Sequence, residues 1–188
     1  LITPANPYDE LNGHAIQLTH LYTSLMTRAI LTAHEVAVKI EQPLYGWVDL
    51  HEGGGIYLDD AETGEPLGLP GKTPDELQQL SAKLVLSEIN PNGWWNRSFE
   101  ERPERFARGR RVVQAILEKH GDTNDSIAIF SHGAFFNYFI SALFAQEERP
   151  PVWFYLNNTG ITRIDLRNGN ATLVYSNRTE HLPPDLLT

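Results

Sequence analysis

The chain has 188 residues, 41% hydrophobic and 21% charged, which is typical of one globular domain with a sizeable core. Its formal net charge of −9 disfavours binding to nucleic acid or to an anionic membrane surface. The absence of cysteine excludes disulfides, thiolate metal sites and cysteine nucleophiles. No apolar run approaches the roughly 18 residues of a membrane span, and no signal peptide opens the sequence. We therefore expect a cytoplasmic protein without a membrane partner.

The first half of the chain predicts a strand, two helices and a glycine-rich segment. Residues 17–23 are typical of a buried strand, and apolar residues recur at helical spacing from Met26 to Ile40. Residues 51–72 are rich in glycine and proline, which favours a long ordered loop or a mobile lid. Thr73 and the Pro-Asp-Glu that follows it predict a capped helix extending to about Ser87.

The second half alternates helices with strands and ends in a hairpin. The predicted elements are a helix over 103–120 ending at Gly121, a strand over 126–130, a turn at 131–133, a helix over 134–144, and hairpin strands over 161–166 and 171–175. This alternation predicts an α/β fold with a mainly parallel central sheet flanked by helices and a C-terminal antiparallel hairpin. Ligands of such sheets bind beyond the carboxyl ends of the strands.

Two candidate site residues follow predicted strands directly. Arg28 lies in the first turn of the helix after strand 17–23, where free N–H groups, the helix dipole and a guanidinium would favour a phosphate. His132 lies between strand 126–130 and an apolar helix, and Gly133 next to it allows close approach of the backbone to a ligand. A surface arginine on a capped helix and a core histidine are the ordinary alternatives.

A carboxylate in the glycine-rich segment is the third candidate. Glu52 precedes Gly53-Gly54-Gly55, and a carboxyl group held over a pocket could protonate a leaving alcohol. Taken alone, Glu52 in a solvated turn is the more common arrangement.

Together and in this order, these motifs resemble the histidine phosphatase superfamily, the phosphoglycerate-mutase-like group. The resemblance covers nearly the whole chain from about Pro7 and is carried by Thr23-Ser24-x-x-x-Arg28-Ala29-x-x-Thr32-Ala33, His51-Glu52-Gly53-Gly54-Gly55, Ser131-His132-Gly133, Asn157 to Thr162 and Asn177 to Leu182. It implies one domain over residues 1–188. It also implies a phosphomonoester phosphatase that acts through a phosphohistidine on a phosphorylated small molecule, without a cofactor. By this resemblance Arg28, His132 and Gly133 bind the phosphate and Glu52 is the acid. A homodimer is compatible with the sequence but is not required by it.

The sequence departs from the family pattern in two places. The defining Arg-His-Gly element, whose histidine is the nucleophile, does not occur, because no Arg-His pair exists in the chain. The stretch from Leu11 to Ala15 resembles the opening of a helix that relatives complete before the next strand. We therefore expect residues to be missing before Leu1 and near Ala15, with the nucleophile among them. The alternatives are a phosphoglycerate mutase of the same fold and a catalytically inactive phosphate-binding or interaction domain.

Other motifs in the sequence are incomplete. A nucleotide-binding loop ending in Gly71-Lys72-Thr73 would need glycine where Pro66 stands. A serine-hydrolase elbow around Ser131 would need glycine at Ile129. The histidines show no metal-ligand spacing, so we expect no metal site. Arginines between positions 97 and 111 alternate with glutamates, which favours a solvated helix face.

Overall fold

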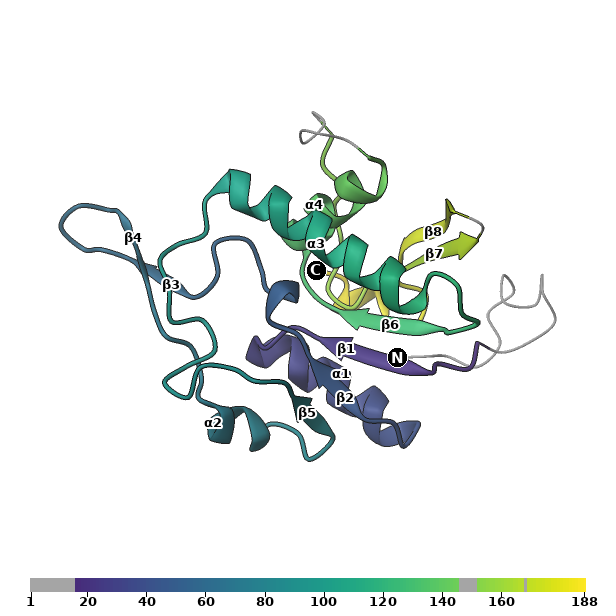
Figure 1. The fold of residues 1–188 in the computed structure, drawn as a ribbon, viewed down its shortest axis with the longest axis horizontal. Coiled ribbons are helices and arrows are strands. Elements are labelled where there is room, and N and C mark those ends of the chain that lie inside the picture. The colour runs from purple at the N-terminus through teal and green to yellow at the C-terminus, as the bar shows by residue number, and fades with distance from the viewer. Residues whose placement is uncertain (1–15, 146–151, 168) are drawn as a thin grey trace.

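The computed structural model describes residues 16–145, 152–167 and 169–188, and its core is a four-stranded parallel sheet (Figure 1). The strand order is β5-β2-β1-β6. The sheet strands are β1 (His20–Thr23), β2 (Leu44–Gly46), β5 (Leu84–Leu86) and β6 (Ile127–Phe130). β1 pairs in register with β2 on one side and with β6 on the other. The central position of β1 places Ser24 and the helix that follows it at the middle of the sheet's carboxyl edge.

Helices cover both faces of this sheet. The covering elements are α1 (Thr27–Lys39), the short helix η2 (Val48–Leu50), α2 (Pro74–Gln78), α3 (Arg102–His120) and α4 (Gly133–Leu143). On one face, α1 packs on Leu21 and Leu44 together with the indoles of Trp94 and Trp95. On the other face, Val112 and Ile116 of α3 and Phe135 of α4 pack on Tyr22 of β1. The two faces follow from the alternation of side chains along β1.

The predicted α/β fold class is therefore confirmed, and so are the helices over 26–40, 103–120 and 134–144 to within two residues at each end. Arg102–His120 ends at Gly121, as predicted. The expected hairpin is β7 (Ile161–Arg167) with β8 (Asn170–Arg178), and it forms a separate two-stranded sheet. A final short helix, η3, covers Pro184–Leu186. None of the helices in the described part of the chain is both long and apolar enough to span a membrane.

The predicted helix from residue 74 to about Ser87 is wrong beyond its first turns. The capping box of Thr73 and Glu76 forms as predicted, but α2 ends at Gln78. Leu84 to Leu86 instead form the edge strand β5, which pairs with β2. The strand buries Leu84 in the sheet core, and the Gln78 side chain donates to the Leu84 carbonyl, so tertiary contacts override the local helical preference.

The glycine-rich segment 51–72 also contains more regular structure than its sequence predicts. β3 (Tyr57–Asp59) and β4 (Pro66–Gly68) form a short antiparallel hairpin that projects from the sheet (Figure 1). The Asp60 carboxylate closes the turn by accepting hydrogen bonds from the Glu62 and Thr63 backbone N–H groups. The three-residue strands are too short for their alternation to be recognised in the sequence.

The central position of β1 gives a prediction about stability. Leu21→Ala should lower the free energy of unfolding by about 3 kcal/mol, because Leu21 is fully buried between α1 and the sheet. Urea unfolding measures this change, with Leu31→Ala as the control because Leu31 is 48% exposed on α1. Equal effects of the two substitutions would contradict the core described here.

Candidate active site

The three candidate residues lie together at the carboxyl edge of the sheet. The Nε of Arg28, in the first turn of α1, donates to Nδ1 of His132 across 3.1 Å. The Nη2 of Arg28 lies 3.9 Å from Oε2 of Glu52. The Arg28 side chain is 64% exposed, so its guanidinium stays accessible to a ligand while it contacts both partners.

Ser24 fixes the orientation of the His132 ring. Because Arg28 can only donate, Nδ1 of His132 must accept, and the ring proton is on Nε2. This Nε2–H group donates to Oγ of Ser24 at 2.9 Å. Ser24 Oγ also accepts from the Met26 backbone N–H at 3.2 Å. The sequence marked Ser24 only as part of the Arg28 motif and did not indicate this role.

Two helices begin beside these side chains. Met26 is the N-cap of α1 and His132 is the N-cap of α4. Neither cap residue satisfies the first-turn N–H groups with its side chain. The positive ends of two helix dipoles therefore lie near Arg28, which is an environment that favours an anion.

The Glu52 carboxylate is held in place by backbone donors. Its Oε1 accepts from the Gly53 N–H at 2.9 Å and from the Phe135 N–H, at the start of α4, at 3.3 Å. Its Oε2 faces Arg28. The glycines that follow Glu52 serve packing, because a Cβ on Gly55, which has φ of +82°, would lie only 2.0 Å from the Trp95 ring.

His51 orients the backbone of Glu52. The fully buried His51 ring has its Nδ1 at 2.7 Å from the Glu52 carbonyl, which can only accept, so Nδ1 carries the proton. The opposite nitrogen, Nε2, accepts from Arg97, whose guanidinium also lies 4.1 Å from the Trp95 ring centroid. Sequence reasoning treated His51 only as part of the glycine-rich motif.

A buried arginine supports this loop from behind. Arg108 is fully buried and forms a two-pronged ion pair with Glu100, at 2.6 and 2.8 Å. Its Nη1 donates to the carbonyls of Asp49 and His51 at 2.8 and 2.9 Å. The expectation that the arginines of this region form a solvated face is thus wrong for Arg108. Its Glu100 lies eight residues away, a spacing that helical i,i+4 patterns do not reveal.

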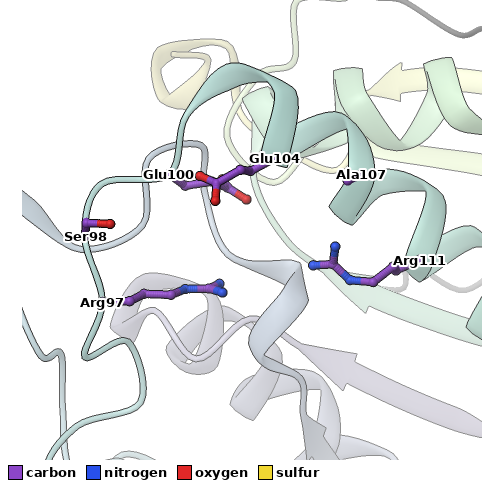
Figure 2. A pocket seen from close by; sticks show the side chains of 6 residues that line it. All are labelled: Arg97, Ser98, Glu100, Glu104, Ala107 and Arg111. Carbon is purple, nitrogen blue, oxygen red and sulfur yellow. The ribbon is translucent and has the colours of Figure 1, made fainter.

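Two hollows flank this network. The larger, about 730 Å³, opens directly beside Arg28 and Glu52 and is walled by Met26, Ile56 and Trp94, with Lys72 on its rim. The smaller, about 190 Å³, is lined by Glu100 together with Arg97, Ser98, Glu104, Ala107 and Arg111 (Figure 2). Arg97 and Arg111 point into it toward one another, but Arg97 already donates to His51 and Arg111 to Asp49. The first hollow is therefore the candidate site for the body of a ligand.

A family model described as the histidine phosphatase superfamily (branch 1) matches residues 8–179. This match extends over most of the chain and includes Arg28, Glu52 and His132. The chain belongs to the histidine phosphatase superfamily.

Several solved structures share this fold. A phosphoserine phosphatase mutant from Entamoeba histolytica, in complex with phosphoserine, aligns with a TM-score of 0.55 at 21% identity, covering 94% of this chain and 80% of its own. YhfR from Bacillus stearothermophilus aligns with a TM-score of 0.55 at 22% identity, covering 93% and 81%. The ecdysone phosphate phosphatase of Bombix mori, in complex with tungstate, has a TM-score of 0.50 at 15% identity, with coverage of 85% and 63%. Among curated proteins no match to the sequence was found.

In this superfamily member both site histidines are neutral. Burial, reinforced by the nearby Arg28 and Arg108 charges, lowers the pKa of His132 to about 3. Burial and the Arg108 charge lower the pKa of His51 to about 2, against a backbone hydrogen bond to Glu52 that raises it. The positive charge beside the hollow therefore comes from Arg28 and Lys72, and the neutral histidines do not add to it.

These pKa shifts predict that the protein loses stability in mild acid. Below about pH 6.5 the unfolded chain protonates both histidines while the native state does not, so stability falls until the native pKa values of about 3 and about 2 are reached. Between about pH 7 and about pH 5.5 the free energy of unfolding should fall by about 1 kcal/mol for each histidine. Urea unfolding at both pH values measures this. His132→Gln should show roughly half the dependence of the wild type, and a wild type that is insensitive to pH over this interval would contradict the neutral assignments.

Proposed function

We propose that this protein is a phosphomonoester phosphatase that acts through a phosphohistidine intermediate, with Arg28, His132 and Glu52 in its site. The observation that carries the proposal is the single Arg28 guanidinium that contacts both His132 and Glu52 where α1 and α4 begin. A phosphoryl dianion placed there would meet a guanidinium, an imidazole and free N–H groups on different sides.

Phosphate binding would change the hydrogen-bond partners of Arg28 and His132. The dianion takes the Arg28 Nε–H group from which His132 now accepts, and its charge favours a proton on the His132 ring instead of opposing one. His132 then donates to a phosphoryl oxygen, and the Gly133 N–H donates to another. A Cβ at Gly133 would meet no atom within 4 Å, so the space beside its Cα is open.

The proposed reaction has two displacements. A histidine nitrogen attacks phosphorus, the bond from phosphorus to the alcohol oxygen breaks, and Glu52 gives its proton to that oxygen. Water then attacks the phosphohistidine, Glu52 takes up a proton, and phosphate leaves. His51 and His132 each have both ring nitrogens engaged in hydrogen bonds, so the proposal assigns the nucleophile to neither.

The relatives support the class of substrate. Two structural neighbours are phosphatases, one of phosphoserine and the other of ecdysone phosphate. The large hollow beside Arg28 has room for an organic group attached to the phosphate. We propose a phosphorylated small molecule as the substrate.

A second candidate function is non-catalytic binding of phosphate. It is favoured by the engagement of both ring nitrogens of His132 and of His51 in hydrogen bonds. In this function the Arg28 cluster would still bind the anion, but no phosphoryl group would be transferred.

Arg28→Ala tests the site under either function. It should weaken phosphate binding measured by calorimetry, and lower kcat/KM for p-nitrophenyl phosphate by roughly a hundredfold or more, because it removes the charge at the pocket centre. Arg110→Ala is the control, since Arg110 is exposed on α3 away from the cluster.

The combined readouts separate the functions. Binding with turnover that depends on Arg28 supports the phosphatase, and binding without turnover supports the phosphate-binding domain. Turnover of 3-phosphoglycerate to 2-phosphoglycerate, without release of phosphate, would replace the phosphatase by a mutase. An Arg28→Ala protein that binds and reacts within a few-fold of wild type would refute the site itself.

A further inference from the structure

A second cluster of chemically active side chains lies at the opposite end of β1. His20 begins β1, His120 is the last residue of α3, and Asp125 stands in the loop that leads to β6. One potential ligand atom from each residue lies within 4.8 Å of the other two. In the part of the chain that the structure describes, this is the one group of three such side chains. The proposed phosphatase chemistry uses none of them.

The two histidines face the two oxygens of one carboxylate. Nδ1 of His120 lies 2.7 Å from Oδ2 of Asp125, and Nδ1 of His20 lies 3.7 Å from Oδ1. The two imidazole rings meet edge to face, with centroids 4.8 Å apart. The three potential metal-ligand atoms therefore surround a common region between β1, the end of α3 and the loop before β6.

Two neighbouring hydroxyl groups form hydrogen bonds with these potential ligand side chains. Nδ1–H of His120 donates to Oδ2 of Asp125 at 2.7 Å, because a carboxylate can only accept, and Nε2 lies 2.9 Å from the Tyr22 hydroxyl. A cation bound at Nδ1 would displace this proton, and Nε2–H would then donate to the Tyr22 hydroxyl. Thr19 donates its hydroxyl to Oδ1 of Asp125 at 3.3 Å. Outer hydrogen bonds of this kind fix the tautomer and direction of histidine ligands.

We propose that His20, His120 and Asp125 form a binding site for a divalent cation of the zinc class, separate from the phosphate pocket. Two imidazole nitrogens and one carboxylate oxygen are a common donor set for Zn²⁺, which lies about 2.0–2.2 Å from each ligand. Ligand atoms around such an ion are roughly 3.5 Å apart, which small side-chain rotations from the observed 2.7 and 3.7 Å can reach. The side chains of His20 and Asp125 are 30% and 24% exposed, so an ion can enter from solvent and keep a water ligand.

The charges around this cluster predict a moderate affinity for the divalent cation. The site holds one carboxylate, and the Lys119 ammonium lies 5.2 Å from the Tyr22 ring centroid, on the side of the same cluster. This positive charge opposes a cation, so we expect a Kd on the order of micromolar, well above the values of closed structural zinc sites.

Binding should stabilise the fold and leave the phosphate pocket in place. His20 is four residues before Ser24, roughly 13 Å along an extended strand, and therefore remote from the reacting groups. An ion here links the start of β1 to α3 and to the β6 loop. Because it binds the native arrangement of three separate elements, it should raise the thermal midpoint with increasing concentration.

The test is calorimetric titration of Zn²⁺ into the chelator-treated protein, with thermal unfolding in parallel. His20→Ala and Asp125→Asn each remove one ligand, and His34→Ala is the matched control because His34 bonds to Ser81 outside the cluster. Circular dichroism establishes that each variant is folded. We expect one Zn²⁺ per chain in wild type and His34→Ala, and roughly tenfold or greater loss of affinity in both ligand variants.

The thermal shift provides the second readout. Zn²⁺ should raise the midpoint of wild type and of His34→Ala but not that of Asp125→Asn, which preserves side-chain size. Folded wild type that binds no Zn²⁺, or binding that is unchanged in both ligand variants, would overturn the proposal. Phosphate binding at Arg28 is independent of this outcome, so failure of one proposal leaves the other standing.

Discussion

The site depends on the buried ion pair between Arg108 and Glu100. Burying a guanidinium costs several kcal/mol unless every donor is used, and Arg108 uses its donors on Glu100 and on the carbonyls of Asp49 and His51. These carbonyls belong to the segment that enters the glycine-rich loop. Arg108 thereby links this glycine-rich backbone to α3. The link fixes the backbone next to Glu52, whose carboxylate faces Arg28.

The same arrangement shows how an acidic protein could hold the proposed anion site. Positive potential there would come from Arg28, Lys72 and two helix N-termini, and does not require a basic surface. Burial lowers the pKa of both histidines, so they remain neutral and add no charge beside Arg28. Positive charge on His132 is favoured only when an anion is present to balance it.

The sequence predicts the fold class and the three candidate residues because strand ends and helix starts carry local signals. Arg28 and His132 follow strands directly, and Glu52 adjoins a glycine run. The residues that support them have no such signal, since Arg108 meets Glu100 and the His51 carbonyl only through tertiary folding. The cluster of His20 and His120 was overlooked for the same reason, because its members are separated by 100 residues. Leu84 to Leu86 pair with β2 and form a strand, which local helix signals could not anticipate.

The position of a bound tetrahedral oxyanion tests the central claim most directly. A crystal structure of the protein with tungstate should place the metal oxyanion beside Arg28, within hydrogen-bond distance of the His132 ring and the Gly133 N–H, with the bond between Arg28 and His132 broken. Tungstate bound in the hollow between Arg97 and Arg111, with Arg28 still bonded to His132, would contradict the account.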